Sequence, residues 1–215
     1  MAELRTEEEQ IQAIKDWWKK NGSSLLIGIG AALAIVFGWQ AWQNHQTQQR
    51  AEAANQFANL LNAFSSAEDD ETVAFVAETL RNDYADSAYA IYGNLVLARQ
   101  QMLEQGDPAA AADSLSWALE QSAEHPALAL IIRNRLARAQ FAAKDYDAAL
   151  ATIDGAQNAD AFAAIFSELR GDVLLAQGDR EGAREAYLAA REQGQQGRSG
   201  VLELKLSDLG VGEDA

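Results

Sequence analysis

The chain has no cysteine and only two prolines and two histidines among its 215 residues. Without cysteine it has no disulfide, thiolate metal ligand or thiol nucleophile, so packing alone must hold the fold together. His45 and His125 lie far apart in the sequence, and no paired-histidine metal spacing, glycine-rich phosphate loop or Ser–His–Asp set is recognisable. We therefore expect a protein that is not an enzyme, without catalytic residues, metal or cofactor.

Charge is also missing from one long stretch, residues 21–49. The formal net charge is −15; residues 1–50 hold five acidic and five basic side chains, and residues 51–215 hold 27 and 12. The whole excess belongs to the C-terminal part, which would repel a phosphate backbone, so we expect no nucleic-acid partner. A solubilising surface is a sufficient reason for this charge.

Within the uncharged stretch, residues 25–42 are almost purely apolar. A helix over this run would be about 27 Å long, close to the hydrocarbon thickness of a bilayer. Tryptophans stand on both sides, where aromatic residues meet lipid headgroups: Trp17, Trp18, Trp39 and Trp42. The sequence predicts a transmembrane helix at residues 23–43, a tail at residues 1–22 and a folded domain at residues 44–215.

A cleaved secretory signal is the competing interpretation, because Ala32-Leu33-Ala34 matches an A-x-A cleavage pattern. The apolar run continues past that point, and Glu7-Glu8-Glu9 precedes it, whereas the leading region of a signal is short and basic. We expect the span to be retained.

Basic residues gather before the span and are nearly absent after it: Arg5, Lys15, Lys19 and Lys20, against Arg50 alone up to Arg81. Positive flanks stay in the cytoplasm. The sequence therefore predicts a cytoplasmic N-terminus and an exported domain. In a Gram-negative bacterium this is a single-pass inner-membrane protein with residues 44–215 in the periplasm.

The tail and the span each present a helix face. Residues 6–9 form a capping box, and apolar residues then share one face of a short amphipathic helix: Ile11, Ile14, and Trp17 or Trp18. Asn21-Gly22-Ser23 is expected to end that helix before the span. Within the span, small residues recur at spacing four and would let another helix pack closely: Gly30, Ala34 and Gly38.

Helical patterns fill the rest of the chain, and no convincing strand is recognisable. One long helix is expected to continue from the span to residue 64, because no glycine or proline interrupts the pattern. From residue 86 onward, helices alternate with turns such as Gly106-Asp107-Pro108. Residues 201–206 alternate as a strand would, yet residues 202–209 also fit a helix that caps the end.

Two helix pairs match each other over a period of 34 residues. The matching positions are Leu136-Ala137, Lys144-Asp145-Tyr146, Ala149, Ile153 and Ala156, which recur as Arg170-Gly171, Gly178-Asp179-Arg180, Ala183, Tyr187 and Ala190. A weaker earlier copy has Gly106-Asp107, Ala111, Leu115 and Ala118. This period with helix–turn–helix texture is typical of tetratricopeptide repeats; a generic alanine-rich bundle is the alternative. The predicted fold class is all-α, a single N-terminal transmembrane helix followed by a tetratricopeptide-like α-solenoid.

Such solenoids are binding scaffolds. In the repeat family the first helix of each unit lines the concave face, which suits extended or partly unfolded polypeptide. Carried over to this chain, the candidate groove positions are Val96, Gln100, Asn134, Arg138, Phe141, Glu168, Asp172 and Leu175.

The chain also resembles the YfgM-type family of ancillary SecYEG translocon subunits. The likeness follows the same order along nearly the whole chain, at Asn21-Gly22, Gly38-Trp39, Trp42, Asn44-His45-Gln46, Leu136-Ala137-Arg138, Ala148-Ala149-Leu150, Leu169-Arg170-Gly171, Gly178-Asp179, Gly182-Ala183-Arg184 and Leu204-Lys205-Leu206. The resemblance implies a membrane-tethered periplasmic helper, chaperone-like, at the Sec translocon. It also implies a membrane-anchored periplasmic peptidyl-prolyl isomerase of the PpiD type as partner, and newly exported polypeptides as clients.

Two other roles stay open. The family is also tied to restraint of an envelope-stress response regulator by its cytoplasmic tail, which would make this chain a signalling anchor. A scaffold for outer-membrane assembly or cell division would share the repeats.

The charge asymmetry predicts the topology of the chain. A reporter fused after Ala215 should be active in the periplasm, because Lys15, Lys19 and Lys20 hold the N-terminal side in the cytoplasm against a lone Arg50. Activity of the fusion in the cytoplasm only, or a mature N-terminus at residue 35, would contradict this topology.

Overall fold

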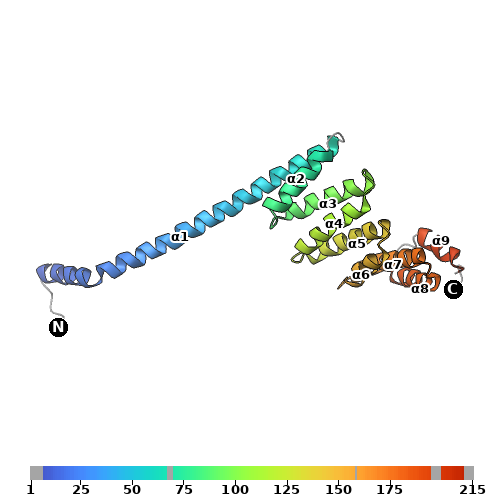
Figure 1. The fold of residues 1–215 in the computed structure, drawn as a ribbon. Coiled ribbons are helices and arrows are strands. Elements are labelled where there is room, and N and C mark those ends of the chain that lie inside the picture. The colour runs from blue at the N-terminus through green and yellow to red at the C-terminus, as the bar shows by residue number, and fades with distance from the viewer. Residues whose placement is uncertain (1–6, 67–69, 158, 195–199, 211–215) are drawn as a thin grey trace. The chain divides into compact units, whose positions relative to one another are not determined.

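The computed structural model describes residues 7–66, 70–157, 159–194 and 200–210, and these residues form α-helices, one 3-10 helix and no strand. In chain order (Figure 1) the elements are α1 (Glu7–Ser66), α2 (Asp70–Asp83), α3 (Ala88–Leu103), α4 (Pro108–Gln121), α5 (Pro126–Ala142), α6 (Tyr146–Asp154), η1 (Asp160–Phe162), α7 (Ala163–Gln177), α8 (Arg180–Gln193) and α9 (Gly200–Asp208). The all-α prediction is confirmed.

The chain divides into two compact units, Met1–Ala51 and Glu52–Ala215. Helix α1 contains a window with a mean hydropathy of 1.8, and only 6% of that window is buried. Among the described helices it alone has the length and composition to cross a membrane. The span at residues 23–43 therefore has a matching helix; its retention and the boundaries of the tail and domain stay predictions.

The expected break at Asn21-Gly22-Ser23 is wrong, because α1 continues through it. The Asn21 side chain donates from Nδ2 to the carbonyl of Trp17 at 3.0 Å, which is compatible with an unbroken helix. Gly22 lies against the ring of Trp18. A helical glycine costs only about 1 kcal/mol relative to alanine, too little to end a helix that continues on both sides. The uninterrupted helix expected from the span to residue 64 is present and ends at Ser66.

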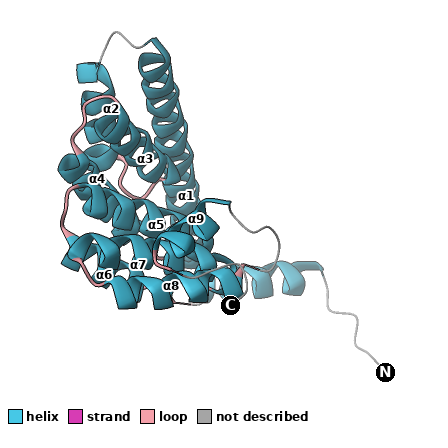
Figure 2. Ribbon diagram, turned by 90° about the vertical axis from the view of Figure 1, so that its right-hand side faces the viewer, coloured by secondary structure: helices cyan, strands magenta, loops and turns pink. Residues whose placement is uncertain are grey.

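In the second unit, consecutive helices pack against each other, and Figures 1 and 2 show α2 to α8 side by side in chain order. Three turns within helix pairs share one design. Each has a residue with positive φ followed by an aspartate whose side chain accepts a hydrogen bond from the backbone N–H three residues on. These are Gly106 (φ 65), Lys144 (φ 63) and Gly178 (φ 90), followed by Asp107, Asp145 and Asp179. In each of these three turns, the residue with positive φ ends the first helix and the aspartate caps the start of the second.

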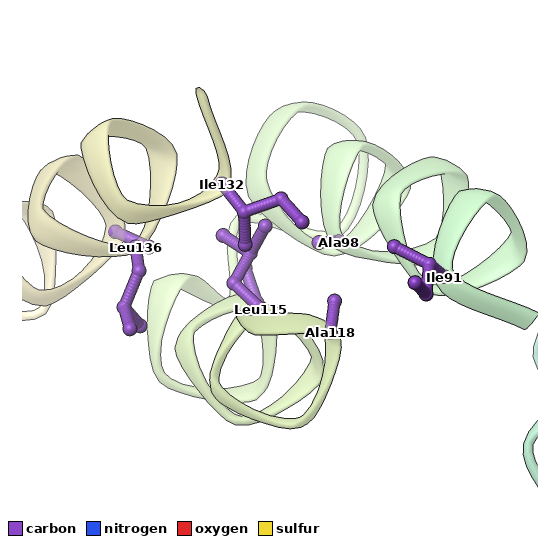
Figure 3. Packing of buried hydrophobic residues seen from close by; sticks show 8 residues of the cluster. Ile91, Ala98, Leu115, Ala118, Ile132 and Leu136 are labelled. Atoms are coloured by element: carbon purple, nitrogen blue, oxygen red, sulfur yellow. The ribbon is translucent and has the colours of Figure 1, made fainter. Parts of the chain in front are cut away.

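The core forms where the second helix of a pair packs between two first helices. Figure 3 shows this for α4, where Leu115 and Ala118 meet Ile91 and Ala98 of α3 and the isoleucine of α5, Ile132. All of these side chains are at most 4% exposed. The corresponding predicted core positions of α6 and α8 are also buried: Ala149, Ile153, Ala183, Tyr187 and Ala190.

The helix pair α5–α6 differs from its copy, the pair α7–α8, in one respect. Helix α6 ends at Asp154, so Ala156 lies beyond the helix, whereas its counterpart Ala190 lies within α8. At the end of α6, the guanidinium of Arg133 donates from Nη1 to the carbonyl of Thr152 at 3.1 Å. A Cβ at Gly155 would be 2.5 Å from that Nη1, so glycine leaves room for the arginine.

The last pair, α7 and α8, has a close helix contact at Gly171. A Cβ at Gly171 would lie 2.9 Å from Cζ of Tyr187 and nearer still to Cε1 and Cδ1. Tyr187 is 1% exposed, and its hydroxyl donates to Oδ1 of Asp172 at 2.8 Å. Residues 201–206 form part of helix α9, not a strand, and Leu202 and Leu206 bury their side chains against α8.

Gly171→Leu should lower the free energy of unfolding of fragment 48–215, which contains the whole second unit, by about 1–3 kcal/mol because the new side chain overlaps the Tyr187 ring. Thermal unfolding measures this loss. Gly200→Leu is the matched control, since a Cβ at Gly200 meets no described atom within 4 Å. An unchanged midpoint for Gly171→Leu would mean that the helices do not cross there.

Tyr187→Phe should lower the unfolding free energy by about 1 kcal/mol at neutral pH through loss of the hydrogen bond to Asp172. Burial and that hydrogen bond raise the pKa of Tyr187 above its usual 10.0. The stabilisation is therefore present below pH 10.0 and is lost as the pH rises through the folded pKa. Stability should decline less steeply above pH 10.0 in Tyr187→Phe than in the parent chain or in Tyr146→Phe. Equal slopes in all three would show that Tyr187 ionises no later in the folded state than in the unfolded one.

Candidate functional site

The stripe predicted within the span lies on an open helix face. Gly30, Ala34 and Gly38 are exposed, and a Cβ built at either glycine meets no described atom within 4 Å. Gly28, also within the span, is equally open. Contact of this stripe with another helix stays a prediction.

The two candidate groove positions on α3 are drawn into the core. Val96 is half-buried and packs against a cluster built from α1, α2 and α3. Gln100 is 2% exposed. Neither presents an open surface to a partner, because the helices around α3 already cover them.

The positions on α5 are more accessible. Arg138 is exposed and donates from Nε to Oδ1 of Asn134 at 3.2 Å. The Nδ2 of Asn134 has no acceptor among the described residues. Phe141 is half-buried, with its ring centroid 6.0 Å from that of Tyr146. Arg138 therefore keeps exposed donors that are available to a partner, whereas the unbonded Nδ2 of Asn134 is buried.

On α7 the candidate positions already have an occupant from the same chain. Lys205 of α9 places its Nζ 2.7 Å from Oε1 of Glu168 and 2.7 Å from Oδ1 of Asp172. Leu175 packs against the cluster that holds Leu202. Helix α9 thus covers the groove positions of the last repeat, and reversing the charge of Asp172 would disturb the fold as well as any binding.

The electrostatics of this cluster favour a charged lysine. Burial acts to lower the pKa of Lys205, but hydrogen bonds and attraction from Asp172 and Glu168 outweigh it and raise that pKa above 10.5. The ammonium also lies 5.5 Å from the centroid of the Tyr187 ring. Charge, ring face and apolar packing together hold α9 on the last repeat.

A cleft of about 540 Å³ between α2, α3 and α4 was not predicted from the sequence. It is lined by Ala74, Glu78, Arg81, Asn82, Asn94, Leu97, Gln101, Ala110, Asp113 and Ser114. Two of these residues form a hydrogen bond, in which the Ser114 hydroxyl donates to Oε1 of Gln101 at 2.8 Å. A second example of this contact exists in the next pair, where the Thr152 hydroxyl donates to Oε1 of Gln140 at 2.7 Å.

One extra residue in the first turn hid this correspondence. The N–H of Asp107 donates a hydrogen bond to the carbonyl of Gln101, six residues earlier. The N–H of Asp145 donates to the carbonyl of Gln140, only five residues earlier. The offset of 38 residues that aligns Asp107 with Asp145 (145 − 107) therefore misaligns α3 with α5 by one residue. An alignment that allowed this insertion would have paired Gln101 with Gln140.

Comparison with known proteins places the chain in a family. The family model for a tetratricopeptide repeat-like domain matches residues 15–211. A protein of Haemophilus influenzae named ancillary SecYEG translocon subunit is 32% identical over 209 residues, covering 97% of this chain and all of the relative. Proteins of the same name from Escherichia coli and Neisseria gonorrhoeae are 31% and 29% identical, covering 95% and 97% of this chain and 97% and 100% of the relatives.

With a matched repeat domain, one candidate membrane helix and relatives aligned almost from end to end, the chain belongs to the family of ancillary SecYEG translocon subunits.

Proposed function

We propose that the chain is an ancillary subunit of the Sec translocon, a membrane-tethered periplasmic scaffold that assists newly exported proteins. The observation that carries this proposal is the near end-to-end match to relatives that bear the translocon name. An α-helical repeat domain behind a single candidate span is the architecture that such a role requires. Its partners in this role are SecYEG, a membrane-anchored peptidyl-prolyl isomerase of the PpiD type, and exported client polypeptides.

The tether supplies part of the recognition. A span confines the repeat domain to the membrane plane, which raises its effective concentration near partners in the same plane. The open stripe of Gly30, Ala34 and Gly38 offers a face for close helix packing with such a partner. The role is binding rather than catalysis, and the orientation that it needs has residues 44–215 in the periplasm.

The polar pair of Arg138 and Asn134 on α5 is the best candidate for client contact among the predicted groove positions. Arg138 is exposed, and the half-buried Asn134 accepts a hydrogen bond from its Nε. The other donors of the guanidinium can bond the carbonyl groups of an extended backbone, which every client offers whatever its sequence.

Gly30→Leu combined with Gly38→Leu should reduce co-purification of SecYEG and the isomerase from mild-detergent extracts several-fold. A Cβ at either position meets no described atom within 4 Å, so the loss would report on a packed partner helix. Gly28→Leu is the control, because it is equally open but lies on another side of the helix. Retained recovery in the double variant would remove the stripe from the interface. Failure of the parent chain to recover any translocon component would refute the proposed role.

A signalling anchor is the second candidate, favoured by apolar side chains exposed on the N-terminal part of α1. Ile11, Ile14, Trp17 and Trp18 are each at least half exposed. Deleting residues 2–20 while keeping the span separates the two roles. Translocon association should survive the deletion under the first role, whereas restraint of a cytoplasmic regulator should be lost under the second.

A further inference from the structure

We propose that the cleft between α2, α3 and α4 binds an arginine side chain presented by an extended polypeptide segment. The inference rests on the proposed function for the identity of that polypeptide, an exported client. The chemistry of the cleft follows from its lining residues.

The cleft is a polar space between three neighbouring helices, which Figures 1 and 2 both show adjacent. Its carboxylates are Glu78 of α2 and Asp113 of α4, both exposed. Its one cation, Arg81, is engaged elsewhere, since its guanidinium carbon lies 5.2 Å from the centroid of the Trp117 ring. Two carboxylates against one guanidinium leave the cleft with a net negative charge, which a cationic group would neutralise.

A buried amide also lines the cleft. Asn94 is 1% exposed, and its Nδ2 donates to the carbonyl of Ala90 at 3.0 Å. No described group donates to its side-chain oxygen. That oxygen is therefore left to accept a hydrogen bond from a donor bound in the cleft, which Asn94 lines.

The next helix pair shows which group fits such a position. Counting back from the shared Gln101–Ser114 and Gln140–Thr152 contacts, the counterpart of Asn94 is Arg133. Thr152 is the counterpart of Ser114, and the guanidinium of Arg133 donates a hydrogen bond to the carbonyl of Thr152. The second pair thus carries its own guanidinium where the first pair has a short amide beside an open cleft.

Arginine fits better than lysine for geometric reasons. A guanidinium is planar and offers five donors in a fixed fork, so it can bond a carboxylate and an amide oxygen together, and its charge persists at every relevant pH. Glu78, Asp113 and Asn94 supply acceptors of both kinds around one cleft. The remaining lining of amide and hydroxyl groups suits the peptide backbone on either side.

The test compares two peptides on the full chain in detergent micelles. One is a short alanine peptide with blocked ends and a single arginine; the other has citrulline, which is nearly isosteric but neutral, in place of the arginine. The arginine peptide should bind at least about tenfold more tightly, as expected for a charged hydrogen bond. Glu78→Gln with Asp113→Asn should abolish the difference, whereas Glu185→Gln with Glu192→Gln, which removes two exposed carboxylates of α8, should preserve it. Equal binding of the two peptides to the parent chain, or an undiminished difference in the cleft variant, would overturn the proposal.

The absence of cysteine allows the site to be located directly. Asn82→Cys introduces one thiol at the cleft, and Glu120→Cys introduces one at an exposed position of α4 outside the cleft lining. An arginine peptide carrying a chloroacetyl group should alkylate Asn82→Cys about tenfold faster than Glu120→Cys, while the citrulline peptide should show no preference. Equal rates with the arginine peptide would place its binding elsewhere and refute the cleft.

These results separate the inference from the function on which it rests. If the parent chain recovers SecYEG but shows no arginine preference, only the cleft proposal fails. If the arginine preference is present and SecYEG is not recovered, the cleft chemistry stands and the translocon role fails.

Discussion

The second unit depends on one repeated constraint, the meeting of a small residue on the first helix of a pair with a large one on the second. Ala98 and Leu115 share one core cluster, Ala137 and Ile153 share another, and Gly171 lies under the ring of Tyr187. With no cysteine in the sequence, these crossings and the apolar area that they bury are what hold consecutive helices together. The exposed surface is then free to carry the acidic excess of the domain.

Much of this arrangement could be predicted, because helix caps and small residues leave local signals. The pairs Gly106-Asp107 and Gly178-Asp179 mark turns whose glycines take positive φ, and the same turn is recognisable at Lys144 from the period alone. Features that depend on tertiary contacts could not be predicted. Helix α6 ends where Gly155 admits Arg133, a partner on another helix. The break expected at Asn21-Gly22-Ser23 failed for the opposite reason, since a weak local signal was overridden by helix on both sides.

The candidate site was predicted less well than the fold, because a groove depends on what covers it. The groove positions taken as equivalent have three different surroundings. The extra residue in the first turn makes Gln100 the counterpart of buried Ala139, and Gln100 is enclosed by its neighbours, whereas Arg138 is exposed and Asp172 is held by Lys205. Sequence periodicity treats these positions as equivalent, whereas the structure gives the first pair an open cleft and the last pair a covering helix. The two ends of the repeat array are therefore unlike as binding surfaces.

A cleft that accepts one side chain can give only modest affinity, since binding a flexible segment costs several kcal/mol of lost freedom before any contact contributes. Modest affinity is an advantage for a protein that handles chains in transit, because a tightly held segment would be released slowly. In the proposed role, tethering would offset the weakness, because a domain linked to one span would meet client polypeptides at the same membrane surface at an effective concentration on the order of millimolar. The acidic surface then selects among them, because the field of residues 51–215, net −15, attracts basic segments and repels acidic ones. Tether, field and cleft would thus act in sequence on the same basic segment.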